Sequence, residues 1–214
     1  PPLIIFPLWI FLDIVQFLSK VIEPPDSLKI IVSSDSKKII NIAKKYGAEV
    51  PFIRPKFLSK DKTHTIEVIK HAIRHLINQG NKIKYVCCIY PATPLMIRSD
   101  LINSFKMIKK INKNFLISAV EYSYPVEKSF YLKNNKVKLY QPNNHSKSSH
   151  LLKRSYHDAG QFYWAKTKTW LKKKSILNNN SYIYKLSQLR AQDVDTISDW
   201  KIIENLYKIK FKWY

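Results

Sequence analysis

Glycine is scarce in this chain, with Gly47, Gly80 and Gly160 the only three among 214 residues. The phosphate-binding loops G-x-G-x-x-G and G-x-x-x-x-G-K-[ST] both need glycines within a few residues of one another. Neither loop can be written anywhere in the sequence. A dinucleotide-binding fingerprint and a P-loop are therefore both excluded.

Cysteine is rarer still, and its placement excludes a disulfide framework. Cys87 and Cys88 are neighbours in an apolar run, and neighbouring residues of a strand point to opposite faces of the sheet. They therefore cannot easily bond each other or share a metal. Two buried, inert thiols are typical of a reducing compartment, so we expect a cytoplasmic location.

Long apolar runs are also lacking. The most apolar stretch, Leu3 to Leu18, contains Pro7, Asp13 and Gln16 and falls short of the roughly 20 residues that a transmembrane helix needs. No basic segment precedes it, so it does not resemble a signal peptide either. We expect no membrane partner, and we interpret the opening Pro1-Pro2 as a start inside a structural element.

Acidic residues are few: the chain has 15 Asp and Glu and 37 Lys and Arg, which gives a net charge of +22. This balance indicates a nucleic acid, an anionic surface or an anionic substrate as partner. It is also what a genome biased toward lysine, asparagine, isoleucine and tyrosine produces. The lysines are scattered, whereas a nucleic-acid footprint is clustered. We therefore expect no nucleic-acid partner. A basic nucleic-acid-binding protein stays an alternative that the total charge supports, although the sequence contains no recognised binding motif.

The composition is that of one folded domain. With 45% hydrophobic and 24% charged residues, the chain has ample material for a core. Strand-like and helix-like segments alternate over the first 120 residues, which favours an α/β fold with a mostly parallel sheet. We expect strands at 28–33, 84–90, 115–121, 161–165 and 183–186, helices at 36–46, 65–79, 100–111, 167–173 and 199–207, and an antiparallel hairpin at 129–140.

In such sheets, ligands bind beyond the carboxyl ends of the parallel strands. The expected strand ends are Ser33-Ser34-Asp35, Tyr90-Pro91-Ala92-Thr93 and the segment after Glu121. A substrate site is therefore expected among these residues.

Two carboxylates stand out near the C-terminus, in Gln192-Asp193-Val194-Asp195-Thr196. In an extended stretch Asp193 and Asp195 share one face, because strand side chains repeat every second residue. Mg²⁺ is typically held by one or two carboxylates together with substrate phosphates. The motif therefore predicts a Mg²⁺ site and phosphate chemistry. The alternative is a solvated acidic turn that caps the last helix, since Thr196, Ser198 and Asp199 are good capping residues.

Two other groups carry alternatives that spacing does not decide. Arg190, just upstream of the two carboxylates, suits bidentate donation to a phosphate, or it is a surface arginine. Arg54, with Asp61 and Thr65 before a helix, suits an anion pocket at the helix N-terminus. The alternative for that group is a loop followed by a cap.

In this order, the segments resemble the acylneuraminate cytidylyltransferase family, whose members make CMP-activated nine-carbon sugar acids. The resemblance runs from about Leu28 to Tyr207. Its markers are Ile31-Val32-Ser33-Ser34-Asp35, Lys44-Lys45-Tyr46-Gly47-Ala48-Glu49-Val50-Pro51-Phe52, Arg54-Pro55 with Leu58 and Asp61, and Gln192-Asp193-Val194-Asp195-Thr196. The segments that are similar to the pseudaminic acid branch are Tyr85-Val86-Cys87-Cys88-Ile89-Tyr90 and Asp158-Ala159-Gly160-Gln161-Phe162-Tyr163-Trp164.

The resemblance implies a fold and a reaction. The fold is the Rossmann-like nucleotide-diphospho-sugar transferase fold. In the reaction the anomeric hydroxyl of a nonulosonic acid, pseudaminic acid in this branch, attacks the α-phosphate of CTP and pyrophosphate leaves. Such transfer depends on positioning and charge neutralisation, which is the role implied for Mg²⁺ on the catalytic residues Asp193 and Asp195.

The resemblance also implies which residues contact substrate. With Arg190 added on the phosphate argument, the expected substrate-binding residues are Arg54, Asp61, Thr65, Tyr90, His157, Asp158, Gln161, Tyr163 and Arg190. Arg54 and Thr65 would lie at the cytidine end. Gln161 and Tyr163 would face the sugar. Tyr90 stands where relatives that use sialic acid have a glutamine, so its role stays open.

One part of the family pattern has no counterpart in this sequence. Family members open with a strand and a loop reading approximately I-P-A-R-x-G-S-K-x-I-x-x-K-N, which wraps the triphosphate, and Pro1-Pro2-Leu3-Ile4 resembles the stretch just after it. We therefore expect a single cytidylyltransferase domain over residues 1–214 that lacks the first strand and the phosphate loop. A non-catalytic remnant of the family stays an alternative. Family members usually dimerise, which implies that part of Tyr122 to Ser149 contacts a partner.

Overall fold

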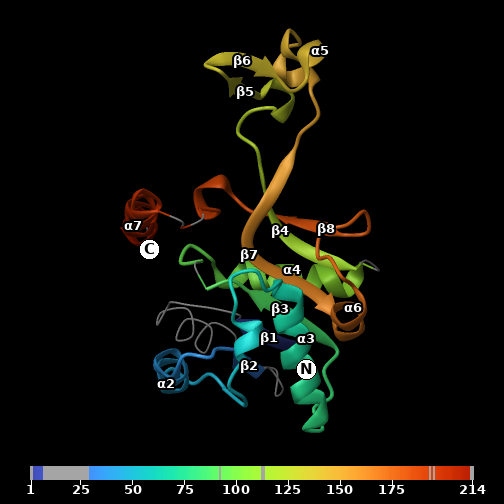
Figure 1. Cartoon of the computed structure of the whole chain (residues 1–214), viewed down its shortest axis with the longest axis vertical. Helices are drawn as coiled ribbons and strands as arrows, with labels where there is room; N and C mark the ends of the chain where they lie inside the picture. Colours follow the sequence, from blue (N-terminus) through green and yellow to red (C-terminus); the bar gives the residue numbers. More distant parts are fainter. Residues whose placement is uncertain are drawn as a thin grey trace.

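A six-stranded sheet with the strand order β2-β1-β3-β7-β4-β8 forms the centre of the molecule (Figure 1). The computed structural model of the chain describes residues 2–6, 29–91, 93–111, 114–192, 194 and 196–212. Every strand of this sheet except β7 runs in the same direction. The mostly parallel α/β sheet expected from the alternation of strands and helices is confirmed.

The strands form where β-branched and aromatic residues are dense, because these side chains pack well on a pleated surface. The main sheet contains β1 (Pro2–Phe6), β2 (Lys29–Val32), β3 (Tyr85–Ile89), β4 (Phe115–Glu121), β7 (Tyr156–Lys166) and β8 (Tyr182–Lys185). β3 is buried throughout and β4 almost throughout, as strands covered on both faces are.

The helices and turns follow the expected order. They are α2 (Lys37–Lys45), η1 (Lys56–Leu58), α3 (Thr65–Asn78), α4 (Arg98–Lys110), η2 (Val126–Lys128), α5 (Pro142–His145), η3 (Ser149–Leu151), α6 (Thr167–Lys172), η4 (Gln188–Arg190) and α7 (Ile197–Lys212), where η marks a 3₁₀ turn. α3 buries Ile66, Ile69 and Ile73, one stripe at helical spacing. The chain reverses just after it at Gly80, whose φ of 83° favours glycine.

The position between β2 and β3 is filled by residues 2–6. β1 pairs in parallel with both neighbours, so that Ile4 lies opposite Ile30 on one side and Cys87 on the other. The expectation that this strand is missing from the sheet is therefore wrong, because β1 occupies the place between β2 and β3. An apolar run such as Pro2–Phe6 can take this place because it has the composition that interior parallel strands need. Residues 7–28 lie outside the described part of the chain, so the expectation about the phosphate loop stays a prediction.

The antiparallel elements differ from expectation in where they lie and where they begin. The hairpin forms from β5 (Phe130–Lys133) and β6 (Lys136–Leu139) around Asn134 and Asn135, whose positive φ values are those of a tight hairpin turn. It is a separate two-stranded sheet, set at one end of the molecule away from the main sheet (Figure 1). The antiparallel strand of the main sheet is β7, which starts at Tyr156 rather than at Gln161 and lies between β3 and β4.

Two apolar cores lie on the two faces of the main sheet. α3 and α6 cover one core, which contains Phe115 and Trp170, and α2 and α4 cover the other, which contains Phe162 and Trp164. Side chains that alternate along β7 enter different cores, because strand side chains alternate between faces. Tyr163 therefore faces the α3 side of the sheet.

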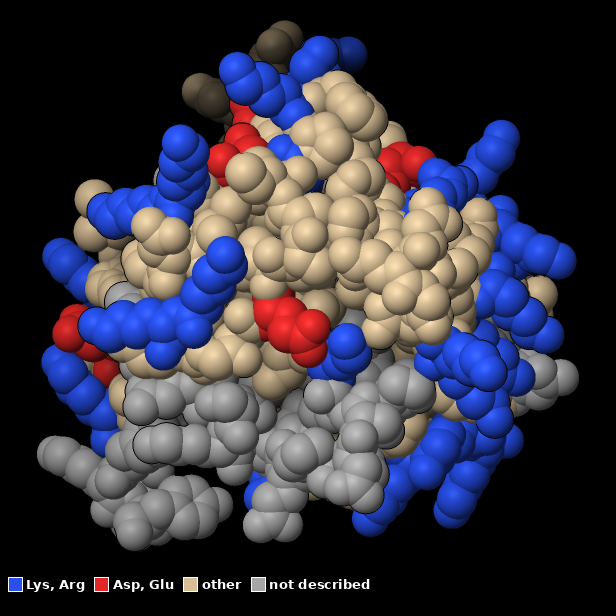
Figure 2. Space-filling model, turned by 90° about the horizontal axis from the view of Figure 1, so that it is seen from below, with Lys and Arg blue, Asp and Glu red and all other residues tan. Residues whose placement is uncertain are grey.

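Lys and Arg side chains dominate the charged surface. Figure 2 shows one face on which they lie at both sides of a mainly uncharged centre. Over the described residues of that face, the positive charge does not gather into one stripe. None of the helices in the described ranges has the length and apolarity that crossing a membrane requires.

Candidate active site

Polar residues from several strands meet at one edge of the main sheet. Ser33, Ser34 and Asp35 follow β2, and Tyr90 follows β3. β7 runs the other way, so its first residues, with Asp158 paired to Ala119, lie at the same edge beside the end of β4. Ser33 is fully buried, and its hydroxyl has no hydrogen-bond partner within the described residues. This is the edge where ligands of parallel sheets bind.

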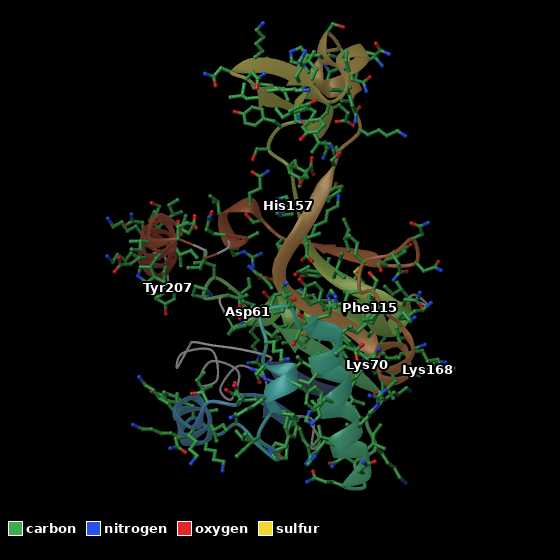
Figure 3. The ribbon with its side chains drawn as sticks, viewed as in Figure 1. Asp61, Lys70, Phe115, His157, Lys168 and Tyr207 are labelled. Carbon is green, nitrogen blue, oxygen red and sulfur yellow. The ribbon has the colours of Figure 1, made fainter. Side chains whose placement is uncertain are left out.

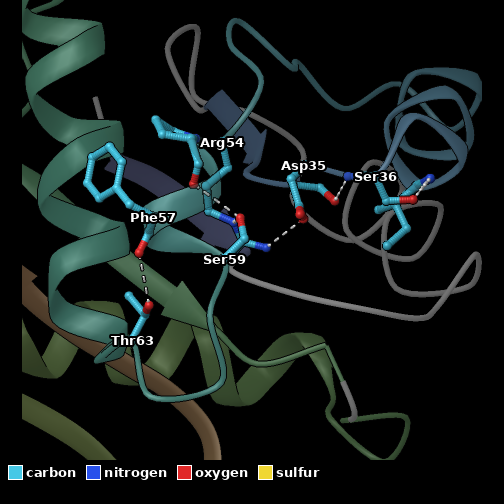
Figure 4. Close-up of polar contacts among 9 residues, drawn as sticks. Asp35, Ser36, Arg54, Phe57, Ser59 and Thr63 are labelled. Carbon is cyan, nitrogen blue, oxygen red and sulfur yellow. Dashed lines mark hydrogen bonds and ion pairs between the residues drawn. The ribbon is translucent and has the colours of Figure 1, made fainter.

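Arg54 is fixed beside the end of β2 (Figure 4). It is 2% exposed, its Nε donates to Ser59 Oγ at 3.1 Å, and its Nη2 lies 3.5 Å from Asp35 Oδ1. Burial lowers the pKa of Arg54, and the neighbouring Asp35 carboxylate opposes that change. The guanidinium stays charged. The site therefore contains a rigid cation at the position that the resemblance assigns to the cytidine end.

Thr65 and Tyr90 are joined by a hydrogen bond. Thr65 is the first residue of α3, and its Oγ1 lies 2.7 Å from the Tyr90 hydroxyl. The Tyr90 ring packs edge-on against the Tyr163 ring, with centroids 5.3 Å apart. Burial raises the pKa of Tyr90, so the phenol stays protonated at neutral pH. Tyr90 thus lies between Thr65, expected at the cytidine end, and Tyr163, expected at the sugar.

Tyr163 and Asp158 form a second pair. The Tyr163 hydroxyl lies 3.0 and 2.9 Å from the two carboxylate oxygens of Asp158. Burial, followed by the Asp158 charge, raises the pKa of Tyr163, which therefore remains the donor. Asp158 Oδ1 also accepts a hydrogen bond from Gly160 N at 2.9 Å. The carboxylate is held in one orientation at an exposed position.

A bulge in β7 places Gln161 at the same edge. The register of β4 and β7 shifts between Ile117 and Ala119, and Gly160 has a φ of 62°, as in bulges that use glycine. Ser118 Oγ accepts hydrogen bonds from the backbone N–H of Gln161 at 3.2 Å and of Phe162 at 3.0 Å. Gln161 is 2% exposed, and its Oε1 is buried without a partner among the described residues.

Arg190 pairs with Asp100, a residue that the sequence reasoning missed. Asp100 lies in the first turn of α4, is 5% exposed, and accepts hydrogen bonds from both terminal guanidinium nitrogens of Arg190. It also accepts one from the Tyr184 hydroxyl at 3.2 Å. Phosphate binding by Arg190 stays a prediction. An aspartate in the first turn of a helix interacts favourably with the helix dipole. Because this role is common, the sequence gives no sign that Asp100 has a partner as distant as Arg190.

Asp61 and His157 lie on the outside of this cluster (Figure 3). Asp61 is exposed in the turn before α3. His157 is exposed on β7, where that strand leaves the body of the molecule (Figure 3), and its ring lies 4.7 Å from that of Tyr122. The structure therefore brings Thr65, Tyr90 and their neighbours together, while Asp61 and His157 remain at the periphery.

Asp193 and Asp195 lie outside the described residues, so the metal site expected there stays a prediction. Beyond them, Thr196 Oγ1 accepts a hydrogen bond from Asp199 N at 3.2 Å, and Asp199 Oδ2 accepts one from Thr196 N at 2.8 Å. This reciprocal cap confirms the capping role of Thr196 and Asp199. By their chemistry, the carboxylates of Asp193 and Asp195 are a donor set that suits Mg²⁺. The described ranges contain no cluster of three or more His, Cys, Asp or Glu placed to hold a metal ion.

Comparison with known proteins shows to which family the chain belongs. A sequence model of a family described as cytidylyltransferase matches residues 14–210. The pseudaminic acid cytidylyltransferase of Campylobacter jejuni subsp. jejuni serotype O:2 is 35% identical over 182 residues, which cover 85% of this chain and 78% of that protein. The chain belongs to the cytidylyltransferase family. This cytidylyltransferase is therefore a nucleotidyltransferase, and the resemblance to the pseudaminic acid branch is confirmed.

A second relative agrees with the assignment, and a solved structure has the same fold. The Helicobacter pylori protein named pseudaminic acid cytidylyltransferase and UDP-2,4-diacetamido-2,4,6-trideoxy-beta-L-altropyranose hydrolase is 30% identical over 194 residues, which cover 90% of this chain and 35% of that protein. The structure of CMP:2-keto-3-deoxy-manno-octonic acid synthetase complexed with CTP has a TM-score of 0.65 at 10% identity and covers 100% of this cytidylyltransferase and 99% of that chain. At this identity the likeness shows the fold alone, and it confirms the expected fold class.

Proposed function

We propose that this cytidylyltransferase transfers CMP from CTP to the anomeric hydroxyl of pseudaminic acid and releases pyrophosphate. The observation that carries the substrate is the 35% identity over 182 residues to a pseudaminic acid cytidylyltransferase. The cluster of Arg54, Thr65, Tyr90, Asp158 and Tyr163 at one sheet edge supports it. That cluster supplies a cation, neutral hydroxyl donors and a carboxylate, which are the groups that a nucleotide and a polyhydroxylated acid need.

The position of each residue indicates which substrate it would bind. Arg54, held rigidly by Asp35 and Ser59, would bind at the cytidine end, with Thr65 beside it. Tyr163 holds the Asp158 carboxylate, so that a sugar hydroxyl could donate to it. These groups orient the two substrates, and orientation alone lowers the barrier substantially.

Asp193 and Asp195 are proposed to hold Mg²⁺, in agreement with their oxygen donors. When bound, the metal would neutralise the charge that develops on the triphosphate during transfer. Arg190 precedes the segment that carries these carboxylates, and the Gln161 side-chain amide donates a hydrogen bond to the Arg190 carbonyl oxygen.

We also propose a homodimer that uses the hairpin end of the molecule. Phe130 is 54%, Leu132 64% and Val137 56% exposed, and the register of β5 and β6 places these three on one face of the hairpin. Contiguous exposed apolar residues of this kind mark protein contacts. We place the reaction in the cytoplasm, where CTP is available and where Cys87 and Cys88 would stay reduced.

The test is product analysis by mass spectrometry. The purified chain is incubated with Mg²⁺ and either CTP or UTP, and with either pseudaminic acid or N-acetylneuraminic acid. We expect CMP-pseudaminic acid from the CTP and pseudaminic acid pair, at a rate well above that of the other pairs. Preferential formation of CMP-N-acetylneuraminic acid would overturn the proposed sugar and leave the nucleotide assignment in place.

A further inference from the structure

Asp100 joins three elements of the fold at a buried point. It lies in the first turn of α4 with 5% exposure, and it accepts hydrogen bonds from Arg190 beyond β8 and from Tyr184 in β8. The Arg190 side chain is itself only 23% exposed. A buried ion pair of this kind is costly to desolvate, and alternative apolar packing would serve stability at least as well. Its presence therefore suggests a role in orienting what it holds.

Arg190 is held from its backbone as well as from its side chain. The Gln161 amide nitrogen donates to the Arg190 carbonyl oxygen, and the Arg190 N–H donates to Ser187 O at 2.9 Å. Gln161 in turn accepts a hydrogen bond at its own carbonyl from Tyr90 N at 2.9 Å. Arg190 is thus connected to the ends of β3 and β8, to the bulge of β7 and to the start of α4.

The chain that leaves this anchor runs directly into the acidic segment. Gln192 follows Arg190 by two residues and opens the segment that ends at Thr196. At its far end that segment is fixed by the reciprocal hydrogen bonds between Thr196 and Asp199. Arg190, which precedes this segment, is therefore held by α4, and Thr196, which ends it, caps α7.

We propose that Asp100 is a positioning residue for the reaction, which acts by fixing Arg190 and with it the entry to the segment Gln192–Thr196. The inference rests on the proposed function, because that function makes Asp193 and Asp195 the metal ligands. In this arrangement the Arg190 guanidinium orients the chain instead of contacting a phosphate. Residues that orient ligands from outside the coordination sphere affect metal affinity and activity strongly.

Asp100→Asn tests the proposal, with Ser104→Ala as matched control. The asparagine keeps the shape of the side chain and removes the charge that holds Arg190. Ser104 is on the same helix, is fully buried, and accepts a hydrogen bond from Trp164 Nε1 at 3.0 Å, so its loss destabilises α4 without touching Arg190. Hydrogen exchange of the peptide that spans 188–196 is measured first, because it needs neither substrate nor metal.

In Asp100→Asn we expect exchange in that peptide to rise by at least about 10-fold, and in Ser104→Ala to stay at the wild-type rate. We further expect Mn²⁺ affinity in the presence of CTP, measured by electron paramagnetic resonance, to fall by about 10-fold to 100-fold in Asp100→Asn alone. kcat should fall with it while the KM for pseudaminic acid changes little. If Asp100→Asn does not fold, Arg190→Lys is measured in the same way, since it keeps the charge but loses the planar fork.

The outcomes separate the two proposals. Equal exchange, Mn²⁺ affinity and kcat in Asp100→Asn and Ser104→Ala would overturn the positioning role while wild-type turnover still supported the proposed function. A wild-type chain that binds no Mn²⁺ with CTP and forms no CMP-sugar would overturn the proposed function and the positioning role with it.

Discussion

Replacing Tyr163 by phenylalanine removes one hydroxyl from the centre of the site. That hydroxyl lies 3.0 and 2.9 Å from the carboxylate oxygens of Asp158, and a hydrogen bond to a charged group contributes about 1.5–3 kcal/mol. Asp158 is exposed, so water replaces the lost donor and the lower end applies. We therefore expect the free energy of unfolding to fall by about 1.5 kcal/mol, which lowers Tm by roughly 3–6 °C for a chain of this size.

The same substitution should change the response to alkaline pH. Burial and the Asp158 charge raise the pKa of Tyr163, so the folded protein keeps a proton that the unfolded chain releases above about pH 10. The unfolded state then binds fewer protons, and wild-type stability falls with rising pH. Tyr163→Phe lacks this contribution, so its decline above about pH 10 should be shallower by about 1.4 kcal/mol per pH unit.

The assay is urea unfolding between pH 7 and 11, combined with steady-state kinetics at pH 7. Tyr85→Phe is the matched control, because Tyr85 is also buried, at 7% exposure, and lies in β3 away from Asp158. We expect kcat/KM for pseudaminic acid to fall by about 10-fold in Tyr163→Phe, since the Asp158 carboxylate loses its fixed orientation. Identical stability, pH slope and kinetics in the two variants would refute the reasoning.

Three other predictions concern the core and the hairpin. Burial raises the pKa of the Cys87 and Cys88 thiols, so stability should begin to fall above about pH 8.5, and the double Cys→Ala variant should show a shallower fall in urea titrations. Trp170→Ala should cost about 3–5 kcal/mol in the same titrations, because this side chain is fully buried and donates to Val86 O. Leu132→Asp with Val137→Asp should convert a dimer into a folded monomer by light scattering, and an unchanged mass would contradict the proposed interface.

The sequence predicts the parallel strands and the main helices because their signals are local. The apolar runs of β3 and β4 are short, β-branched and bounded by polar residues, and α3 has a full apolar stripe. The resemblance likewise placed Thr65 and Tyr163 near the substrate, and the structure brings both to Tyr90. The strand and helix signals depend on neighbouring residues only, whereas the placement of Thr65 and Tyr163 came from the resemblance.

The remaining features depend on contacts between distant segments. The place of β7 between β3 and β4 is set by pairing and cannot be read from its own composition. The partnership of Asp100 with Arg190 joins α4 to the end of η4, and neither residue has a local signal for it. The sheet centre is a third case, since the resemblance implied a vacancy there and β1 fills it.

Pyrophosphate release tests the central claim most directly. The chain is given CTP, Mg²⁺ and pseudaminic acid, alongside the Asp193→Ala and Asp195→Ala double variant. We predict sugar-dependent release by the wild type and a fall of at least about 100-fold in the double variant, since the metal would lose both proposed ligands. Undiminished release in the double variant would contradict the metal site, and no release by a folded wild-type chain would contradict the cytidylyltransferase activity and favour the non-catalytic remnant.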